Sequence, residues 1–274
     1  MQPDAVREQL LAFFTQGEDA MVLGVVRQVR ENPYSVTARL SSAKLGRTVQ
    51  AESLLEYDFL NILDFDPRVR KYGEQCLVIP WKSSDGRRRS YHPDVLVQFD
   101  EEWMSRDSRL RASVFEVKPS TVLREQWPEL KPKYRATLRA LRGTGVRFRI
   151  ITEQQIDPVF AANVRFLMNY KKPRMLEQRS PQEQAMDGAL LKLVWEIREP
   201  ITPQEILDRF ATTFELRAEL LARIWCFAAL CTLEADLIEP LTMATPLWPS
   251  RYHHFSDRFF LEPKWRQPDH DWYR

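Results

Sequence analysis

The sequence predicts a mixed α/β domain followed by a mainly helical one. Two short runs, within residues 90–99 and 110–118, are rich in β-branched and aromatic residues, as buried strands are. Segments with apolar residues at helical spacing lie before and after these runs. Beyond residue 172 three helical patterns follow one another. An α/β arrangement in the first part and a helical one in the second follow from these patterns.

The first part alternates between helical and extended patterns. Ser53 is the expected N-cap of a helix that contains Glu56, and the pair fits a capping box. Pro93 indicates that the strand "SYHPDVLVQF" begins near Asp94. A polar loop is expected at 100–109. The other expected elements are helices at 5–14, 126–142 and 157–170 and extended segments at 35–42, 75–83, 110–118 and 146–152.

The predicted domain boundaries follow the change in pattern. Residues 1–172 form the α/β domain, and a connection rich in Pro and charged residues follows it. Residues 173–249 offer three helices and a turn-rich segment, the outline of a winged helix-turn-helix domain. Residues 250–274 form a tail with seven aromatic residues.

Composition narrows the class of protein. The chain has 274 residues, and its three cysteines show neither metal-ligand spacing nor a disulfide framework. No apolar run is long enough to cross a membrane, and the first residues lack a signal-peptide pattern. We therefore expect an intracellular, cytoplasmic protein with no membrane partner.

The net charge of +2 conceals two halves of opposite sign. Residues 1–176 carry 29 Lys and Arg against 22 acids, whereas residues 177–249 carry 6 against 12. The excess in the first part is concentrated at 124–149, with eight basic residues against two acids. The first half is therefore suited to a polyanion such as DNA, and the second half is not.

Two carboxylates and an amine stand at the ends of the two apolar runs. Asp94 opens the first run, while Glu116 and Lys118 close the second and point to the same face of a strand. If the two strands form a hairpin, Asp94 lies beside Glu116. Their carboxylates, the backbone carbonyl of Val117 and water suit Mg²⁺, with Mn²⁺ as a substitute. Lys118 would then orient a metal-bound water and offset the charge of a scissile phosphate.

A short pattern of this kind also occurs by chance, but its context favours a nuclease. Both acids end apolar runs, a basic helix follows, and the helical Glu56 precedes them. Pro-Asp, a spacer and Glu-x-Lys resemble the restriction-endonuclease-like core, in which a further acid often comes from an upstream helix. That resemblance implies hydrolysis of phosphodiesters without a covalent intermediate.

The wider sequence resembles the TnsA family, the endonuclease subunits of heteromeric Tn-seven-like transposases. The resemblance rests on "KLGRTVQAESLLEYDFLNILDFDPRV", "YHPDVLV" and "FEVKPS" in this order, and on the nuclease core followed by a winged-helix domain. By position, Glu56, Asp94 and Lys118 match the family's helical acid, strand acid and lysine. Glu116 stands where members carry Gln or Glu.

The resemblance implies a function and partners. TnsA-like proteins cut the non-transferred strand near the 5′ ends of the transposon, in the bacterial cytoplasm. The DDE transposase subunit TnsB cuts and joins the 3′ ends, so that the element is excised for cut-and-paste transposition. The AAA+ regulator TnsC couples both to target selection. An autonomous restriction-type nuclease and a non-catalytic adaptor on a nuclease-like fold remain alternatives.

Basic residues supply candidate contacts to the DNA backbone. Lys44 and Arg47 precede the helix that carries Glu56, and either phosphate contact or simple solvation fits them. A helix next to the predicted nuclease site carries a basic stripe for which we favour DNA contact; its members are Lys131, Lys133, Arg135, Arg139 and Arg142.

The helical domain is predicted to bind protein chiefly. Its third helix offers only Arg217 and Arg223 among mainly apolar residues, and the domain is acidic. Phosphate contacts supply most DNA affinity, so such a helix is poorly equipped to bind DNA. The aromatic tail either folds back on the protein or docks on a partner, and the sequence leaves both open.

Overall fold

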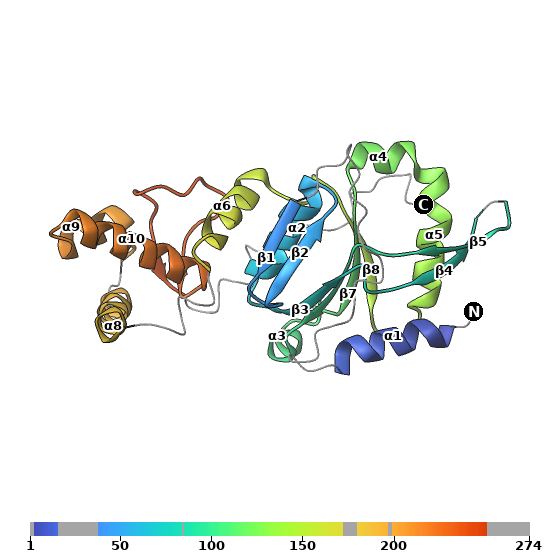
Figure 1. The fold of residues 1–274 in the computed structure, drawn as a ribbon, viewed down its shortest axis with the longest axis horizontal. Helices are drawn as coiled ribbons and strands as arrows, with labels where there is room; N and C mark the ends of the chain where they lie inside the picture. The colour runs from blue at the N-terminus through green and yellow to red at the C-terminus, as the bar shows by residue number, and fades with distance from the viewer. Residues whose placement is uncertain (1–2, 16–37, 84, 172–179, 197–198, 251–274) are drawn as a thin grey trace. The chain divides into compact units, whose positions relative to one another are not determined.

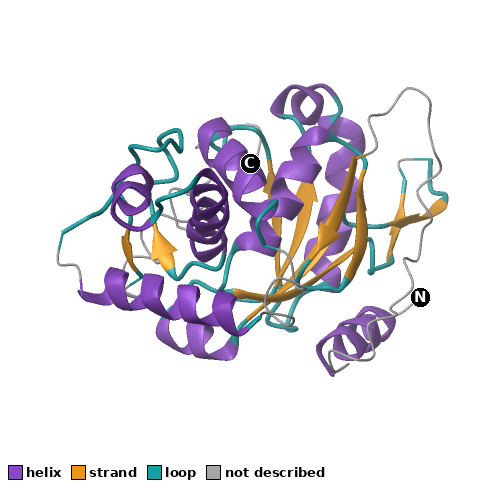
Figure 2. Cartoon of the chain, turned by 60° about the vertical axis from the view of Figure 1, so that its left-hand side comes forward, coloured by secondary structure: helices purple, strands orange, loops and turns teal. Residues whose placement is uncertain are grey.

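A computed structural model describes residues 3–15, 38–83, 85–171, 180–196 and 199–250. The described chain forms two compact units that divide between Gln155 and Ile156. Each unit is described by itself below (Figures 1 and 2).

A four-stranded mixed sheet is the centre of the first unit. Its strands lie in the order β3 (Val69–Glu74), β6 (Val95–Phe99), β7 (Ser113–Val117) and β8 (Arg147–Ile151). Strands β3, β6 and β7 are antiparallel in turn, and β8 runs parallel to β7. Every residue of β6 and β7 is buried, as expected for central strands covered on both faces.

The predicted hairpin is present. Val95 of β6 lies opposite Phe115 of β7, which brings the two ends that carry Asp94 and Glu116 together. The connection differs from the predicted polar loop, because it contains the helix α3 (Glu101–Arg106). The Asp100 side chain caps this helix by accepting from the backbone N–H of Glu102.

Helices cover both faces of the sheet (Figure 1). On one face, Phe59 of α2 (Leu54–Phe65) contacts Phe115, with ring centroids 5.1 Å apart. The other face is covered by α1 (Pro3–Thr15), α4 (Ser120–Glu125) and α5 (Trp127–Ala140). Their buried side chains join those of the sheet in one cluster that includes Leu10, Leu96, Val114, Leu123, Leu130 and Tyr134.

Two hairpins flank the sheet and were only partly predicted. Strand β1 (Ala38–Ser42) pairs with β2 (Arg47–Ala51), and β4 (Ile79–Lys82) pairs with β5 (Arg88–Tyr91). Strand β6 begins at Val95, as predicted from Pro93, and the residues before Pro93 belong to β5, which ends at Tyr91. Strands β2 and β3 were not predicted. The architecture is consistent with the nuclease-like N-terminal domain expected from the sequence.

The second unit is mainly helical. It contains α6 (Pro158–Met168), α8 (Pro181–Glu196), α9 (Pro203–Phe210) and α10 (Phe214–Ala229). The short strands β9 (Leu233–Glu234) and β10 (Trp248–Pro249) pair antiparallel after the last helix. Three helices and a two-stranded ladder thus follow in the predicted order, and the winged-helix assignment itself stays a prediction.

Helix α6 lies with the second unit, although the predicted boundary is at residue 172. The Asn163 side chain donates to the carbonyls of Leu237 and Glu239, at 2.8 Å each. Phe166 contacts Trp225 of α10 edge to face. The predicted ranges 1–172, 173–249 and 250–274 stay predictions, and residues 251–274 lie outside the described part of the chain. None of the described helices combines the length and the apolar character that a membrane crossing requires.

Candidate active site

Asp94 is fixed at the sheet end of the hairpin by two backbone groups. The N–H of Val117 donates to Asp94 Oδ2 at 2.6 Å. The N–H of Gln75 donates to the Asp94 carbonyl at 2.9 Å. Gln75 adopts a left-handed backbone conformation with φ of 46°, which a side chain of this kind rarely takes. Two hydrogen bonds and an uncommon backbone conformation at Gln75 thus fix the position of Asp94.

Glu116 is buried and surrounded by hydrogen-bond donors. Its side chain is 2% exposed. The Tyr91 hydroxyl donates to Oε2, and the Tyr134 hydroxyl donates to Oε1 at 3.0 Å. The ammonium groups of Lys133 and Lys118 lie 3.3 and 3.5 Å from Oε1. Hydrogen bonds and two cations thus compensate the cost of burying this carboxylate.

Glu56 reaches the site from the first turn of α2. Ser53 caps the helix as predicted, accepting from the Glu56 N–H at 3.1 Å. The second half of the predicted capping box differs, because the Glu56 carboxylate accepts from the N–H of Glu52 rather than from that of Ser53. Gln75 in turn donates to the Glu52 carboxylate at 2.9 Å. Glu56 is thereby held in a buried position, 5% exposed.

Burial and neighbouring carboxylates raise the pKa of Glu56 and of Asp94. Burial, followed by repulsion from Glu52 and Glu116, raises the pKa of Glu56 to about 7 against an ordinary value of 4.5, although the Glu52 N–H opposes the shift. Burial and repulsion from Glu116 and Glu56 raise the pKa of Asp94 well above its usual range. Lys118 opposes both shifts. The structure thus brings the four predicted side chains into one electrostatic cluster.

The cluster has the chemistry of a site for a hard divalent cation. Buried carboxylates that repel one another gain from a cation placed among them, and oxygen ligands suit Mg²⁺. Among the described residues, however, no group of three or more His, Cys, Asp or Glu side chains is arranged to hold a metal ion. The donor set therefore fits Mg²⁺ in kind, and ligation by Glu56, Asp94, Glu116 and the Val117 carbonyl stays a prediction.

Lys118 is placed by the step from β7 into the following turn. Its backbone N–H donates to the carbonyl of Ile151 at 2.8 Å, continuing the parallel pairing of β7 with β8. The side chain is 25% exposed, with its ammonium beside Glu116. An ammonium group in this position can donate a hydrogen bond to a phosphate near the carboxylates and offset its negative charge.

Sequence reasoning missed the residues that surround the acids. Tyr91 and Tyr134 bind Glu116, and Gln75 links Glu52 to Asp94. No motif marks these side chains, since they come from separate elements. Lys133 was predicted to bind DNA as part of a basic stripe, but its ammonium lies against Glu116.

Lys44 and Arg47 have structural partners. The Lys44 ammonium donates to the carbonyls of Asp66 and Val69. Arg47 forms a two-pronged ion pair with Glu74, whose side chain is 6% exposed. Their DNA contacts stay predictions, while the observed contacts join the β1–β2 hairpin to β3.

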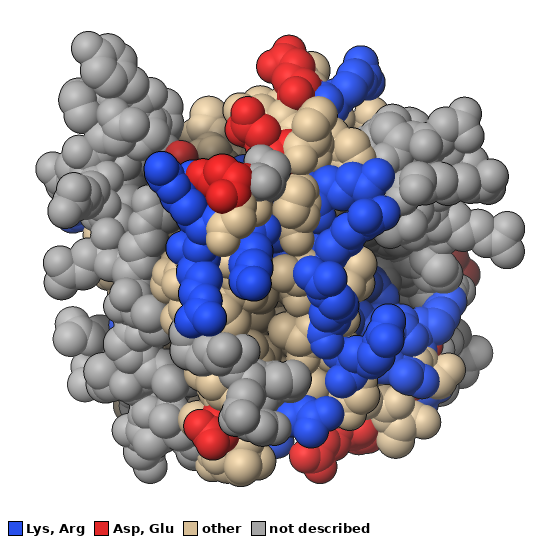
Figure 3. Space-filling view, turned by 90° about the vertical axis from the view of Figure 1, so that its right-hand side faces the viewer, with Lys and Arg blue, Asp and Glu red and all other residues tan. Residues whose placement is uncertain are grey.

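The other members of the basic stripe lie on the solvent side of α5, except Arg142, which follows the end of this helix at Ala140. Arg135, Arg139 and Arg142 are exposed, and Lys131 is half-buried. Leu130, Tyr134 and Thr137 form the buried side of the same helix. Figure 3 shows Lys and Arg side chains gathered on the face that carries α5 and the β4–β5 hairpin. This face has the charge that a DNA backbone attracts.

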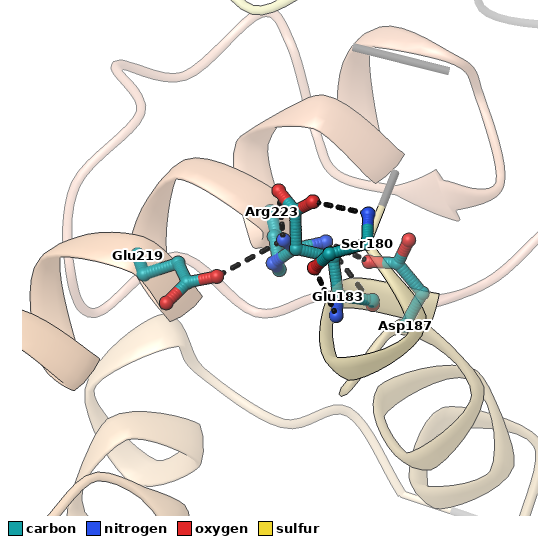
Figure 4. A network of polar contacts seen from close by, with 5 residues as sticks. All are labelled: Ser180, Glu183, Asp187, Glu219 and Arg223. Atoms are coloured by element: carbon teal, nitrogen blue, oxygen red, sulfur yellow. Dashed lines mark hydrogen bonds and ion pairs between the residues drawn. The ribbon is translucent and has the colours of Figure 1, made fainter. Parts of the chain in front are cut away.

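The two arginines of α10 are neutralised by carboxylates. Arg223 is surrounded by Glu183, Asp187 and Glu219, with ion-pair distances of 3.0, 2.6 and 3.0 Å (Figure 4). Arg217 lies 3.0 Å from Asp208. Phe214, at the start of α10, is 80% exposed. This helix therefore offers apolar and acidic groups rather than unneutralised arginines.

Residues 66–153 match the family model described as TnsA-like endonuclease N terminal. This segment is similar to the N-terminal part of TnsA-like endonucleases. It spans the whole four-stranded sheet and includes Asp94, Glu116 and Lys118, whereas Glu56 precedes it. The match confirms the resemblance indicated by the sequence for this part of the chain and supports nuclease activity in transposition. No curated protein matches the chain.

Proposed function

We propose that the chain is a Mg²⁺-dependent DNA endonuclease of a transposon that cuts the non-transferred strand at the 5′ ends. One observation carries the proposal. The matched segment brings Asp94 and Lys118 together around the buried Glu116 carboxylate, and Glu56 interacts electrostatically with these residues.

The site residues divide the chemistry of hydrolysis. Asp94, Glu116 and Glu56 would provide the anionic oxygens that hold Mg²⁺, or Mn²⁺ in its place, with the Val117 carbonyl as a further ligand. The chemistry supplied by the cation would be polarisation of the scissile phosphate and acidification of a water molecule. Lys118 orients the attacking water and offsets the charge that grows on the phosphate. Burial of Glu56 and Glu116 keeps bulk water from weakening these interactions.

The proposed partners are transposon-end DNA, a DDE transposase of the TnsB kind and an AAA+ regulator of the TnsC kind, in the bacterial cytoplasm. The exposed arginines of α5 support DNA contact by the first unit. The neutralised arginines of α10 and the exposed Phe214 support a protein-binding role for the second unit. DNA end recognition then belongs to the transposase.

The two alternatives differ in what they require. A non-catalytic adaptor does not need acids such as Glu56 and Asp94, whose pKa is raised by burial and by neighbouring carboxylates, beside a lysine. The site therefore favours an enzyme. An autonomous restriction-type nuclease has the same site and differs in cutting DNA without a partner.

Strand-resolved cleavage of labelled transposon-end DNA tests the proposal. The chain, its cognate transposase and regulator, and Mg²⁺ should give a cut near the 5′ end of the transposon, and Asp94→Ala should remove that cut alone. Cutting without the transposase would indicate the autonomous nuclease. No cut by the folded chain in the complete system would favour the adaptor.

A further inference from the structure

The Oε1 atom of Glu116 already has more partners than it can bind. Each oxygen of an ionised carboxylate offers about two lone-pair positions. The Tyr134 hydroxyl and the Lys133 and Lys118 ammonium groups all approach Oε1, whereas the Tyr91 hydroxyl donates to Oε2. A metal ion that binds Oε1 must therefore displace one of these partners.

The lysines are the partners that can leave. Tyr91 and Tyr134 are 5% and 3% exposed, and their rings contact each other at 6.0 Å between centroids. Lys133 and Lys118 are 17% and 25% exposed. Their ammonium groups are carried on flexible four-carbon chains and readily find new partners.

Of the two lysines beside Glu116, Lys133 is the one that the sequence motif does not include. It comes from α5 rather than from the strand that carries the motif. Its ammonium lies 4.3 Å from the ring centroid of Tyr91 and 5.0 Å from that of Tyr134, within the range of cation–π attraction. These contacts keep a positive charge beside Glu116 on the side of the tyrosines.

We propose that Lys133 is an internal counter-ion of Glu116 that weakens divalent-cation binding until a DNA phosphate draws its ammonium away. The inference rests on the proposed function, in which Glu116 helps to hold a divalent cation. A positive charge 3.3 Å from a ligand oxygen repels a second cation and occupies the same lone pairs. A phosphate offers the ammonium an alternative partner. Cation and DNA then bind with positive cooperativity, and the metal centre assembles on DNA.

Titration calorimetry tests this inference. It measures the affinity of the full chain for Mn²⁺ in the absence of DNA. Replacing the ammonium in Lys133→Met should tighten Mn²⁺ binding by roughly tenfold, because one unit of repelling charge is removed from a partly solvated site. Lys133→Gln, which keeps a polar end group, should act in the same direction. Lys82→Met, which removes an exposed ammonium group of β4, is the matched control and should leave the affinity unchanged.

A double-mutant cycle assigns the effect to Glu116. In the Glu116→Gln background, Lys133→Met should no longer change Mn²⁺ affinity.

The effect of DNA is a separate test. A short DNA duplex should increase the Mn²⁺ affinity of the unmutated chain more than that of Lys133→Met. Unchanged or weaker binding by both Lys133 variants would overturn the inference. Absence of Mn²⁺ binding by the unmutated chain and all variants, with and without DNA, would overturn the metal-dependent function itself.

Discussion

Glu56 gives the metal-free protein a pH-dependent weakness. Its pKa is about 7 in the folded chain and about 4.5, the ordinary value, in the unfolded chain. The folded state therefore binds more protons between these values, and stability is lost as pH rises from 4.5 through 7. Glu56→Gln keeps an acceptor for the Glu52 N–H but carries no charge.

We expect Glu56→Gln to stabilise the metal-free protein at pH 8 by roughly 3 kcal/mol at most, and to change little at pH 4.5. Urea unfolding in the presence of a chelator measures this difference. Equal effects at the two pH values would show that ionisation of Glu56 is not the cause.

For individual residues, the sequence predicted the acids and the lysine of the candidate site, but not the side chains that contact them. Asp94 directly precedes β6, while Glu116 and Lys118 lie at the end of β7, so a hairpin of the two apolar runs was enough to predict that they lie together. Tyr134 enters the site from α5, and Gln75 enters through an unusual backbone conformation. Such contacts depend on tertiary packing, which no local spacing encodes.

The basic face of α5 leads to a prediction at the scale of a single element. Arg135 and Arg139 are exposed on the side of the helix opposite its buried residues, so their removal costs little stability. The double variant Arg135→Ala, Arg139→Ala should bind DNA more weakly at all sequences and reduce the salt dependence of log K by about one unit per lost phosphate contact.

Fluorescence anisotropy of labelled duplex DNA at several salt concentrations measures this change. Arg106→Ala, which removes an exposed arginine of α3 instead, is the matched control. An unchanged salt slope in the double variant would assign DNA contact to another face.

Elements with a strong apolar pattern were predicted, and polar elements were not. Strands β6 and β7 are buried along their whole length, and apolar residues predominate in both sequences. Strand β3, "VRKYGE", carries charges and a glycine and gains its conformation from pairing with β6. Helix α3 lies in a polar segment, and the Asp100 cap followed by two acids was the signal that could have revealed it.

The opposite charges of the two halves lead to a prediction at the scale of the whole molecule, that DNA binds to the first unit. Arg217 already pairs with Asp208 in the second unit, and its charge is not available without breaking that pair. Arg217→Glu in the full chain should therefore leave DNA affinity within about twofold, since exposed ion pairs contribute little energy. A tenfold or greater loss in the anisotropy assay would place DNA contact on α10.

Single-turnover cleavage of transposon-end DNA by the complete transposase system tests the central claim, that Asp94, Glu116 and Lys118 act as one metal-dependent hydrolytic centre. Asp94→Asn and Lys118→Met should each lower the rate of 5′-end cleavage by about a hundredfold or more in Mg²⁺, with 3′-end cleavage retained. Cleavage at the 5′ ends by either variant at the rate of the unmutated protein would contradict it.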